Sequence, residues 1–358
     1  HLPTISARTP AEVKERLGRI QQALQEKLAE QFGEGTQVTL NGQMSLQEAF
    51  VALEQKTGNQ AFGFENREGM VEVDWQNLAY WKAVDDLLDQ AKLTIEPYGS
   101  HPGALDLTAR ASGQVSRRRY AVYRGPFRFE PQFVRTLRDL QRPANGGLQL
   151  RLAVMWEPRI APISFSLPLS SIKARDDQDR LIQVTRPTAR LNFPVEFSIG
   201  EAVFDIPFAL PEPDAKSFKS IQGTLTANVP GRKARFEFAD LDDADDIQQR
   251  EAGVTVTLDY AGKNEDLYEL RIRVQVDGAG DALASHRGWI YKNDAYLLKD
   301  DQRTETIGSE LKAQTTDSFA IAYFFAVDDL REYRFVYETP ALVLQLTTTF
   351  ELKDIELP

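Results

Sequence analysis

The sequence contains no cysteine, and its 358 residues include only three histidines and three methionines. The absence of cysteine excludes thiol catalysis, disulfide bonds, iron–sulfur ligation and the commonest structural zinc sites. Because histidine is confined to His1, His101 and His286, few arrangements could support a histidine-dependent nucleophilic triad. His286 directly follows a serine, but neighbouring strand residues point to opposite faces, so we interpret it as a turn histidine bonded to the backbone.

Motifs for nucleotide binding and hydrolysis are also missing. The sequence has no GxGxxG, GxxxxGK[ST], HExxH or GxSxG segment. Dinucleotide, nucleoside triphosphate, zinc-protease and serine-hydrolase chemistry therefore have no support. We expect a protein that is not an enzyme and has no cofactor.

No part of the sequence is a long apolar run, and the charge is unbalanced. A bilayer span needs roughly 18 apolar residues or more, so we expect no membrane span. The net charge of -11 would repel a polyanion on average, so we expect no nucleic-acid partner. Arg117, Arg118 and Arg119, followed by Tyr120, form a local basic patch, which we interpret as a solvated linker.

The first predicted element is a helix within residues 1–35. Thr9 can cap it, Pro10 suits its first turn, and Gly33 is a natural stop. Its apolar residues recur every three or four positions and form one stripe, which comprises Val13, Leu17, Ile20, Leu24, Leu28 and Phe32. We expect this stripe to pack against the neighbouring domain, and pairing with the same helix of another copy is the alternative.

Residues 36–112 are predicted to form a small α/β module with the order strand, helix, strand, strand, helix, strand, strand (βαββαββ). Ser45 begins the first helix with Glu48 in the capping-box position, and Gly58 ends it. A second amphipathic helix is predicted over residues 78–91. The pattern indicates a compact domain with one apolar side on each helix.

Two segments of this module carry a family resemblance. The stretches VTLNGQMSLQEAFVALEQKTG and VEVDWQNLAYWKAVDDLLDQAKLTIE resemble the short N-terminal (STN) domain of secretins and TonB-dependent receptors, over about residues 36–111. The resemblance implies a periplasmic docking module that contacts protein partners. Trp75, Tyr80 and Trp81 are bulkier than the family pattern and are candidate interaction residues. The chain after residue 112 resembles neither a secretin ring nor a receptor barrel.

The second half of the chain is predicted to consist of strands separated by proline, glycine and aspartate turns, as is typical of β-sandwiches. An internal repeat predicts two related sandwich domains, over residues 119–241 and 252–358. The aligned segments are 236–241 with 350–355, 204–209 with 319–323, and 175–178 with 299–302. The acidic residues 240–246 are expected to link the two domains.

This tandem unit also resembles known proteins. Its segments SHRGW, NDAYLL and FELKDIELP are similar to cell-envelope proteins of planctomycete-type bacteria that have no established activity. The resemblance implies an exported protein of the periplasm, the cell envelope or the extracellular space. His1 at the first position fits a mature form that has lost a signal peptide, and equally a shortened chain.

Paired carboxylates and aromatic rings are the candidate ligand-binding features of the sandwiches. The weak calcium candidates are Asp176, Asp177, Asp242, Asp243, Asp300 and Asp301. None of these runs has the alternating ligands and the glycine of a calcium loop, so solvated acidic turns are the favoured interpretation. The aromatic candidates are Trp156, Trp289, Tyr291 and Tyr296. They could stack on a sugar, but packing inside the sandwiches is favoured.

The sequence as a whole predicts a multidomain, mainly β protein with an N-terminal helix, a small α/β module and two related antiparallel β-sandwiches. We predict a non-enzymatic, exported cell-envelope protein that acts as a structural, scaffold or assembly unit. Its expected partners are proteins, and exposed sheet edges are expected to allow a homo-oligomer. A carbohydrate-binding protein, or a periplasmic adaptor that docks a secretin or TonB-type machine, is the alternative.

Overall fold

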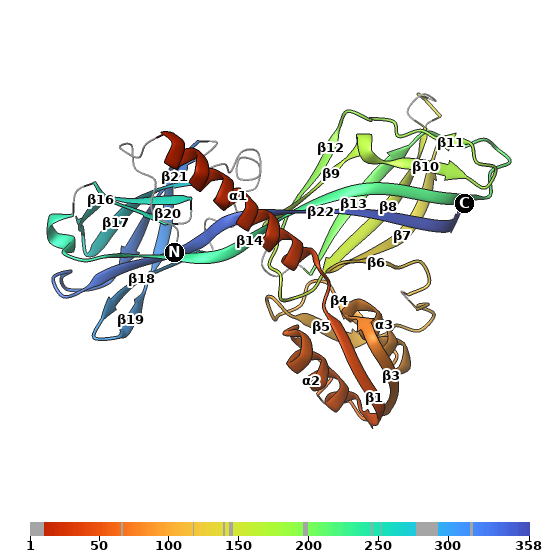
Figure 1. The fold of residues 1–358 in the computed structure, drawn as a ribbon, viewed down its shortest axis with the longest axis horizontal. Coiled ribbons are helices and arrows are strands. Elements are labelled where there is room, and N and C mark those ends of the chain that lie inside the picture. The colour runs from red at the N-terminus through yellow and green to blue at the C-terminus, as the bar shows by residue number, and fades with distance from the viewer. Residues whose placement is uncertain are drawn as a thin grey trace. The chain divides into compact units, whose positions relative to one another are not determined.

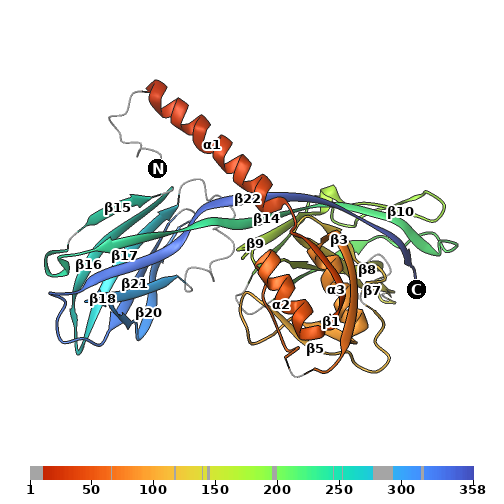
Figure 2. The same ribbon diagram turned by 60° about the horizontal axis from the view of Figure 1, so that its bottom comes forward.

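The computed structural model of the chain is mainly β, with 57% of residues in strands and 13% in helices, which confirms the predicted fold class. The chain forms two compact units, whose elements are labelled in Figures 1 and 2. Unit 1 comprises His1–Ala29 and Asn228–Leu344, and unit 2 comprises Glu30–Ala227 and Gln345–Pro358. The structure describes residues 11–65, 67–116, 118–138, 140–142, 146–195, 200–244, 246–251, 253–276, 293–315 and 318–358.

The N-terminal helix α1 covers Ala11–Gly33 and ends at the glycine that the sequence predicts as its stop. In its apolar stripe Ile20 is 47% exposed, whereas Leu28 and Phe32 are partly buried. Thr9, Pro10 and the side chains of Val13, Leu17 and Leu24 lie outside the described residues. None of the helices in the described part of the chain is long and apolar enough to cross a membrane.

The module of unit 2 has the predicted order of elements. They are β1 (Gln37–Ser45), α2 (Leu46–Thr57), β2 (Ala61–Phe62), β3 (Met70–Ala79), α3 (Tyr80–Gln90), β4 (Leu93–Glu96) and β5 (Leu105–Ala109). Ser45 and Glu48 form the predicted capping box, and Gly58 ends α2 with a left-handed φ of 72°. α3 begins later than predicted, at Tyr80, because β3 continues to Ala79 and pairs there with β1.

Two small sheets and two helices of the module enclose one core. β1 pairs antiparallel with β3, while β5 pairs in parallel with β2 and antiparallel with β4. Phe50 of α2 and Trp81 and Leu87 of α3 are buried in this core. Met155, which belongs to the sandwich of the same unit, is part of the same apolar cluster. The module and the sandwich of unit 2 therefore share buried apolar surface.

The sandwich of unit 2 has one antiparallel sheet in the order β13-β8-β7-β6. Its strands are β6 (Val122–Arg124), β7 (Phe127–Leu137), β8 (Gly147–Trp156) and β13 (Glu201–Phe208). The other strands of this unit are β9 (Ser164–Pro168), β10 (Lys173–Asp176), β11 (Leu181–Ile182), β12 (Arg190–Pro194) and parts of β14 (Ser217–Phe238) and β22 (Arg334–Glu356), with the 3-10 turn η2 (Leu169–Ser171) after β9. Phe129 of β7 stacks on Phe350 of β22 with ring centroids 4.7 Å apart, so the two layers meet through aromatic rings.

Unit 1 contains a second antiparallel sheet, in the order β15-β16-β17-β21-β20. Its strands are β15 (Ile247–Glu251), β16 (Val254–Asn264), β17 (Leu267–Val276), β20 (Gly308–Gln314) and β21 (Ser318–Phe325). The hairpin of β18 (Asp294–Lys299) and β19 (Gln302–Glu305) pairs with β22 through β18. Tyr323 and Phe325 of β21 contact Phe335 of β22, so the core of unit 1 is aromatic as well.

The long strands β14 and β22 each begin in one unit and end in the other. They are neighbours in one sheet. Within unit 2, Gln222 of β14 donates to Glu351 of β22, and within unit 1, Arg334 of β22 donates to Glu237 of β14. The residue numbers of these pairs rise along one strand as they fall along the other, so the strands run antiparallel.

The segments aligned by the internal repeat occupy matching places in the strand order. β13 pairs with β8 beside the meander β6-β7-β8, and β21 pairs with β17 beside the meander β15-β16-β17. Phe236 of β14 and Phe350 of β22 are both buried. Asp240 and Asp354, four residues after each phenylalanine, share a left-handed φ of 54° and 53°.

The unit borders differ from the predicted domain limits of 119–241 and 252–358. Residues 228–241 lie in unit 1, and residues 345–358 lie in unit 2. The described part of the acidic stretch 240–246 lies within unit 1, where Leu241 is buried in the 3-10 turn η3 (Leu241–Asp243), instead of linking two domains. The internal repeat indicates which strands of the two copies are equivalent. It does not indicate that the last strand of each copy continues into the other sandwich.

Candidate functional site

The module is fixed to the sandwich of unit 2 by a buried group of charges, the Arg128 cluster. Arg128 of β7 is fully buried, and its Nε donates to Oδ2 of Asp85 in α3 at 2.9 Å, while its Nη1 donates to Glu130 at 2.5 Å. The hydroxyl of Tyr123 in β6 donates to the same Asp85 oxygen at 2.6 Å. Alternate strand residues face opposite sides of a sheet, so Phe129 fills the sandwich core while Arg128 faces the module.

Burial and pairing set the protonation states in the Arg128 cluster. Burial alone would lower the pKa of the Arg128 guanidinium, but the carboxylates of Asp85 and Glu130 raise it above its ordinary value. Burial and the neighbouring Asp85 carboxylate raise the pKa of the Tyr123 hydroxyl. Removing one partner of a buried ion pair leaves the other charge uncompensated, at a cost of about 3–5 kcal/mol. Loss of a charged member therefore destabilises the junction between the module and the sandwich.

A second buried network, the Glu157 cluster, fixes another edge of the module. Glu157 follows β8 and is 1% exposed. Its carboxylate accepts the backbone N–H of Thr36 at 2.8 Å, the Thr36 hydroxyl at 2.9 Å and Nε of Arg159 at 2.6 Å. Asn59 of the module accepts the backbone N–H of Arg159 at 2.9 Å. The start of β1 and the end of α2 are thereby joined to the sandwich.

Main-chain contacts complete the junction between module and sandwich. The indole N–H of Trp81 donates to the carbonyl of Pro126 at 2.9 Å, and the N–H of Glu157 donates to the same carbonyl at 2.9 Å. Gly125 has a left-handed φ of 53°, and a Cβ there would clash with the carbonyl oxygen of Gly33. The β6–β7 turn thus lies in direct backbone contact with the chain that enters the module, and only glycine fits.

The structure gives the predicted interaction residues roles inside the fold. Trp75, Tyr80, Trp81 and Trp156 are all buried. Trp75 donates to Asp86 within the module at 3.0 Å, Trp81 bonds to the sandwich, and Trp156 packs against Phe165. Large apolar rings fill the cores here, so none of the four presents an exposed partner surface. Trp289, Tyr291 and His286 lie outside the described residues.

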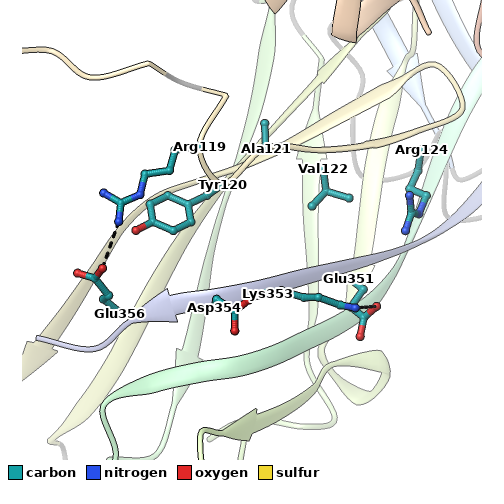
Figure 3. Close-up of a pocket in the computed structure, with 9 residues that line it drawn as sticks. All are labelled: Arg119, Tyr120, Ala121, Val122, Arg124, Glu351, Lys353, Asp354 and Glu356. Atoms are coloured by element: carbon teal, nitrogen blue, oxygen red, sulfur yellow. Dashed lines mark hydrogen bonds and ion pairs between the residues drawn. The ribbon is translucent and has the colours of Figure 1, made fainter. Parts of the chain in front are cut away.

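An open hollow of about 620 Å³ lies between β6 and the end of β22 in unit 2 (Figure 3). It is lined by Arg119, Tyr120, Ala121, Val122, Arg124, Glu351, Lys353, Asp354 and Glu356. Val122 points from β6 toward β22 in the close-up. Nη2 of Arg119 lies 3.3 Å from Oε1 of Glu356 across the hollow, so part of the predicted basic linker forms one of its walls.

β22 is irregular where it borders the hollow. Leu352 and Ile355 are buried, whereas Lys353 and Asp354 between them are both exposed. Asp354 has the left-handed φ of 53°. Two successive exposed residues with one left-handed conformation are typical of a β-bulge, and bulges are frequent at sheet edges and beside binding sites.

The acidic turn after β10 uses its carboxylates within the fold. Asp176 accepts the backbone N–H groups of Gln178 and Arg180 at 2.9 and 2.8 Å and Nε of Arg180 at 2.6 Å. Burial alone would raise the pKa of Asp176, but these donors lower it below its ordinary value. Asp177 accepts the backbone N–H of Lys216 at 3.0 Å. Both calcium candidates of this turn therefore stabilise the turn itself.

The remaining calcium candidates do not come together. Asp242, Asp300 and Asp301 are exposed, and the side chain of Asp243 lies outside the described residues. In the described ranges, no three His, Cys, Asp or Glu side chains are grouped as metal ligands would be.

His101 has a carboxylate and a hydroxyl beside it. Its Nδ1 lies 2.6 Å from Oδ1 of Asp106 and 3.5 Å from Oγ of Ser100, and its ring stacks on Phe62 with centroids 4.0 Å apart. A catalytic triad places the nucleophile and the carboxylate on opposite ring nitrogens. Both neighbours share one nitrogen here, so this geometry is not a triad.

The aromatic candidates for sugar stacking are covered where the structure describes them. Tyr296 is buried, and the guanidinium of Arg303 lies 3.8 Å from its ring centroid. Trp156 is buried against Phe165. These rings offer no open face to a sugar.

Sequence reasoning missed both charge clusters and the hollow. A usable signal was present in β7, where Arg128 and Glu130 alternate with Phe127 and Phe129. Alternating charged and apolar residues predict a strand with one exposed face, but both faces of β7 are buried at residues 127–130. Asp85 gave a similar signal, because it lies among the apolar residues of α3.

The comparisons with family models, curated proteins and solved structures found no match to this chain.

Proposed function

We propose that this chain is a non-enzymatic, exported cell-envelope protein that acts as a scaffold or assembly unit for protein partners. The observation that supports the proposal is the double anchorage of the module, by the Arg128 cluster and the Glu157 cluster. A module that swings to find a partner needs a free hinge. Two buried charge networks and a shared apolar core remove such a hinge and favour a rigid body that holds surfaces in fixed positions.

The export and the envelope location are supported by the sequence resemblances of the module and the tandem sandwiches. The carbohydrate-binding alternative loses its main support, because the tryptophans of the described ranges are all buried. The adaptor alternative shares the scaffold's requirement for a fixed module, and it differs only in the partner that the module meets.

Spin labels test the rigidity on which the proposal depends. Because the chain has no cysteine, Met70→Cys in the module and Leu181→Cys in the sandwich, both at exposed positions, provide unique labelling sites. We expect one narrow distance distribution between the labels. The added pair Asp85→Asn and Glu157→Gln should broaden it, because both buried networks lose a charge. An equally broad distribution without the added pair would contradict a rigid scaffold.

Crosslinking in the native cells tests the assembly role. We expect the wild-type chain to be recovered from envelope fractions in a crosslinked complex of fixed stoichiometry. For the Asp85→Asn and Glu157→Gln double variant, we expect the amount of this complex to fall at least tenfold. Leu181→Ser, at an exposed position far from both clusters in the sequence, is the control and should leave recovery unchanged. Recovery of only the monomeric chain at every crosslinker concentration would argue against assembly.

A further inference from the structure

The two open edges of the sandwich in unit 2 differ in the contacts that cover them. On one side, the edge of β13 is covered by the chain after β11. The N–H of Thr185 donates to Pro207 at 3.1 Å, the N–H of Ala209 donates to Gln183 at 2.8 Å, and Val184 bridges Phe208. Main-chain hydrogen bonds therefore close this side.

The opposite side is crossed by the exposed ion pair of Arg119 and Glu356. Among the strands that the structure describes, β6 is the last of its sheet and has only β7 as a neighbour. The part of β22 in unit 2 has β14 on one side, while β18 pairs with β22 only at residues 334–338, in unit 1. The hollow of about 620 Å³ lies between these two strands (Figure 3). In an antiparallel strand every second residue directs its N–H and C=O away from its partner strand, so both edges have backbone groups that point away from the neighbouring strand.

One contact shows where an edge group points. The guanidinium Nη1 of Arg124 donates to the carbonyl of Tyr123 at 3.0 Å. This side chain is exposed and occupies an acceptor that a neighbouring strand would otherwise use. Displacing this exposed side chain costs little free energy, because water replaces its hydrogen bond when it moves away.

The equivalent side of unit 1 is bridged. There β15 is the last strand of its sheet, and Nε2 of Gln249 in β15 donates to the carbonyl of Glu237 in β14 at 2.6 Å. Glu237 is the residue aligned with Glu351 of the hollow. The carbonyl of Glu237 thus accepts a hydrogen bond from the edge strand in unit 1, whereas the aligned residue Glu351 borders a hollow in unit 2.

The charges around the hollow balance. Its basic residues are Arg119, Arg124 and Lys353, and its acidic residues are Glu351, Asp354 and Glu356. A site of this kind selects neither a polyanion nor a polycation. Each wall contains strand backbone, Val122–Arg124 of β6 and residues 351–356 of β22, and the ligand that matches it is another extended backbone.

We propose that the hollow between β6 and the end of β22 binds an extended segment of a partner protein, which adds to these edges as a β-strand. The walls span residues 119–124, of which Val122–Arg124 is strand, and the six residues 351–356 at the end of β22. At about 3.3 Å per residue, six residues of strand extend roughly 20 Å, so the bound segment is about six residues long. Its main chain supplies the affinity, and its side chains of mixed charge meet the balanced walls.

A different protein fits the hollow better than a second copy of this chain. Each copy carries a net charge of -11, and copies of like charge repel each other at long range. A partner that is less acidic meets no such barrier. The proposal names a use for the assembly unit proposed above, and so it depends on that function.

A peptide display selection tests the proposal directly. The probe is a library of random nine-residue peptides panned on the full-length wild-type chain. We expect enriched peptides that bind at micromolar concentration and slow amide exchange in residues 120–124 and 351–356. Methylating alternate backbone nitrogens of such a peptide should weaken binding at least tenfold, because a strand bound by its main chain loses its donors.

Matched variants locate the binding site. Val122→Trp fills the hollow and should weaken peptide binding at least tenfold, whereas Val115→Trp places the same side chain at an exposed position outside the hollow and should leave it unchanged. Urea unfolding of both variants shows whether Val122→Trp still folds. If it does not, Lys353→Glu, at an exposed position, serves as the second variant and should shift the charge preference of the selected peptides toward basic residues.

The outcomes separate this proposal from the scaffold function. Absence of enriched peptides, or binding that ignores both Val122→Trp and backbone methylation, would overturn the strand site while the rigid, assembling scaffold could still be observed by spin labels and crosslinking. A dimer of the pure chain that Val122→Trp dissolves would assign the hollow to a second copy and overturn the proposal of a different partner.

Discussion

The end of β14 in unit 1 and the end of β22 in unit 2 are the same element of the repeat, but their surroundings differ. Each carries a buried phenylalanine, Phe236 or Phe350, followed by a left-handed aspartate. In unit 1 the neighbouring edge strand β15 is tied to β14 by Gln249. In unit 2 the corresponding edge strand β6 is tied instead to the module, through Tyr123 and Asp85.

The difference shows two ways to hold an edge strand. In unit 1, the hydrogen bond from the edge strand β15 to β14 of the opposite sheet covers the edge between the two sheets. A bond to a module on the outer face holds the strand and leaves its edge free. The module of unit 2 thus holds β6 through Asp85, whereas β15 is held by β14.

The largest expected effect comes from removing the module's hold on β6. Asp85→Ala leaves Arg128 buried without its main partner, so we expect a loss of about 3–5 kcal/mol in the free energy of unfolding of unit 2. Amide exchange in residues 122–124 should accelerate more than exchange in 247–251. Urea unfolding with site-resolved exchange measures both, and Asp74→Ala, an exposed aspartate of the same module, is the control. Equal acceleration in both strands would contradict the comparison.

A smaller effect is expected from the corresponding change in unit 1. Gln249→Ala removes one hydrogen bond to a backbone carbonyl, which contributes about 0.5–1.5 kcal/mol. Exchange should accelerate in 247–251 and remain unchanged in 122–124. The neighbouring Gln248→Ala, on the exposed side of β15, should have no measurable effect. If Gln249→Ala were silent too, the bridge would not be what closes unit 1.

The hairpin after β10 contains a carboxylate, Asp176, whose pKa is lowered by its hydrogen-bond donors. The donors around Asp176 lower its pKa below the ordinary 3.8, so its contribution to stability is present above that value and is lost as the pH falls through the lower, folded value. We expect Asp176→Asn to destabilise the protein at pH 7 and to lose less further stability than wild type below pH about 4. Urea unfolding at both pH values measures this, with Asp300→Asn in the exposed turn as the matched control. Parallel pH profiles for Asp176→Asn and wild type would refute the assignment.

The smallest effect concerns the shared left-handed aspartates. Asp240→Gly and Asp354→Gly each place glycine where it adopts the left-handed conformation without strain, and the gain is offset by the entropy of the unfolded chain. We expect each change to alter the free energy of unfolding by less than about 0.5 kcal/mol. Asp354→Val should cost roughly 1–2 kcal/mol instead. A clear difference between the two glycine variants would show that the hollow strains β22.

The elements were predictable from local patterns, whereas the assembly of the elements was not. The capping box at Ser45 and the glycine stops at Gly33 and Gly58 were confirmed because each depends on residues a few positions apart. The repeat could be aligned for the same reason. The course of β14 and β22 through both units depends on contacts between residues far apart in the sequence, such as Glu237 with Arg334, 97 positions apart, and Gln222 with Glu351, 129 positions apart, which no local pattern encodes.

The candidate site escaped prediction for a related reason. Arg128 and Glu157 look like ordinary surface residues in the sequence, and only the partners Asp85, Thr36 and Asn59 reveal that they are buried. Trp75 and Trp81 were predicted as interaction residues because they are bulkier than the family pattern, but both are buried. They are buried because their large rings fill the cores. Which side chains fill a core becomes known only when the elements have been packed.

The shared strands β14 and β22 have a consequence for how this protein can be shortened. A stop codon placed between the two repeats, at residues 241–252, would remove residues 345–358 from unit 2 and would leave the remainder of the chain without a strand that it needs. Neither repeat is an independent genetic segment. A shortened gene that keeps the sandwich of unit 2 must join residues 30–227 to residues 345–358, whereas the strands of unit 1 lie in the single stretch 228–344.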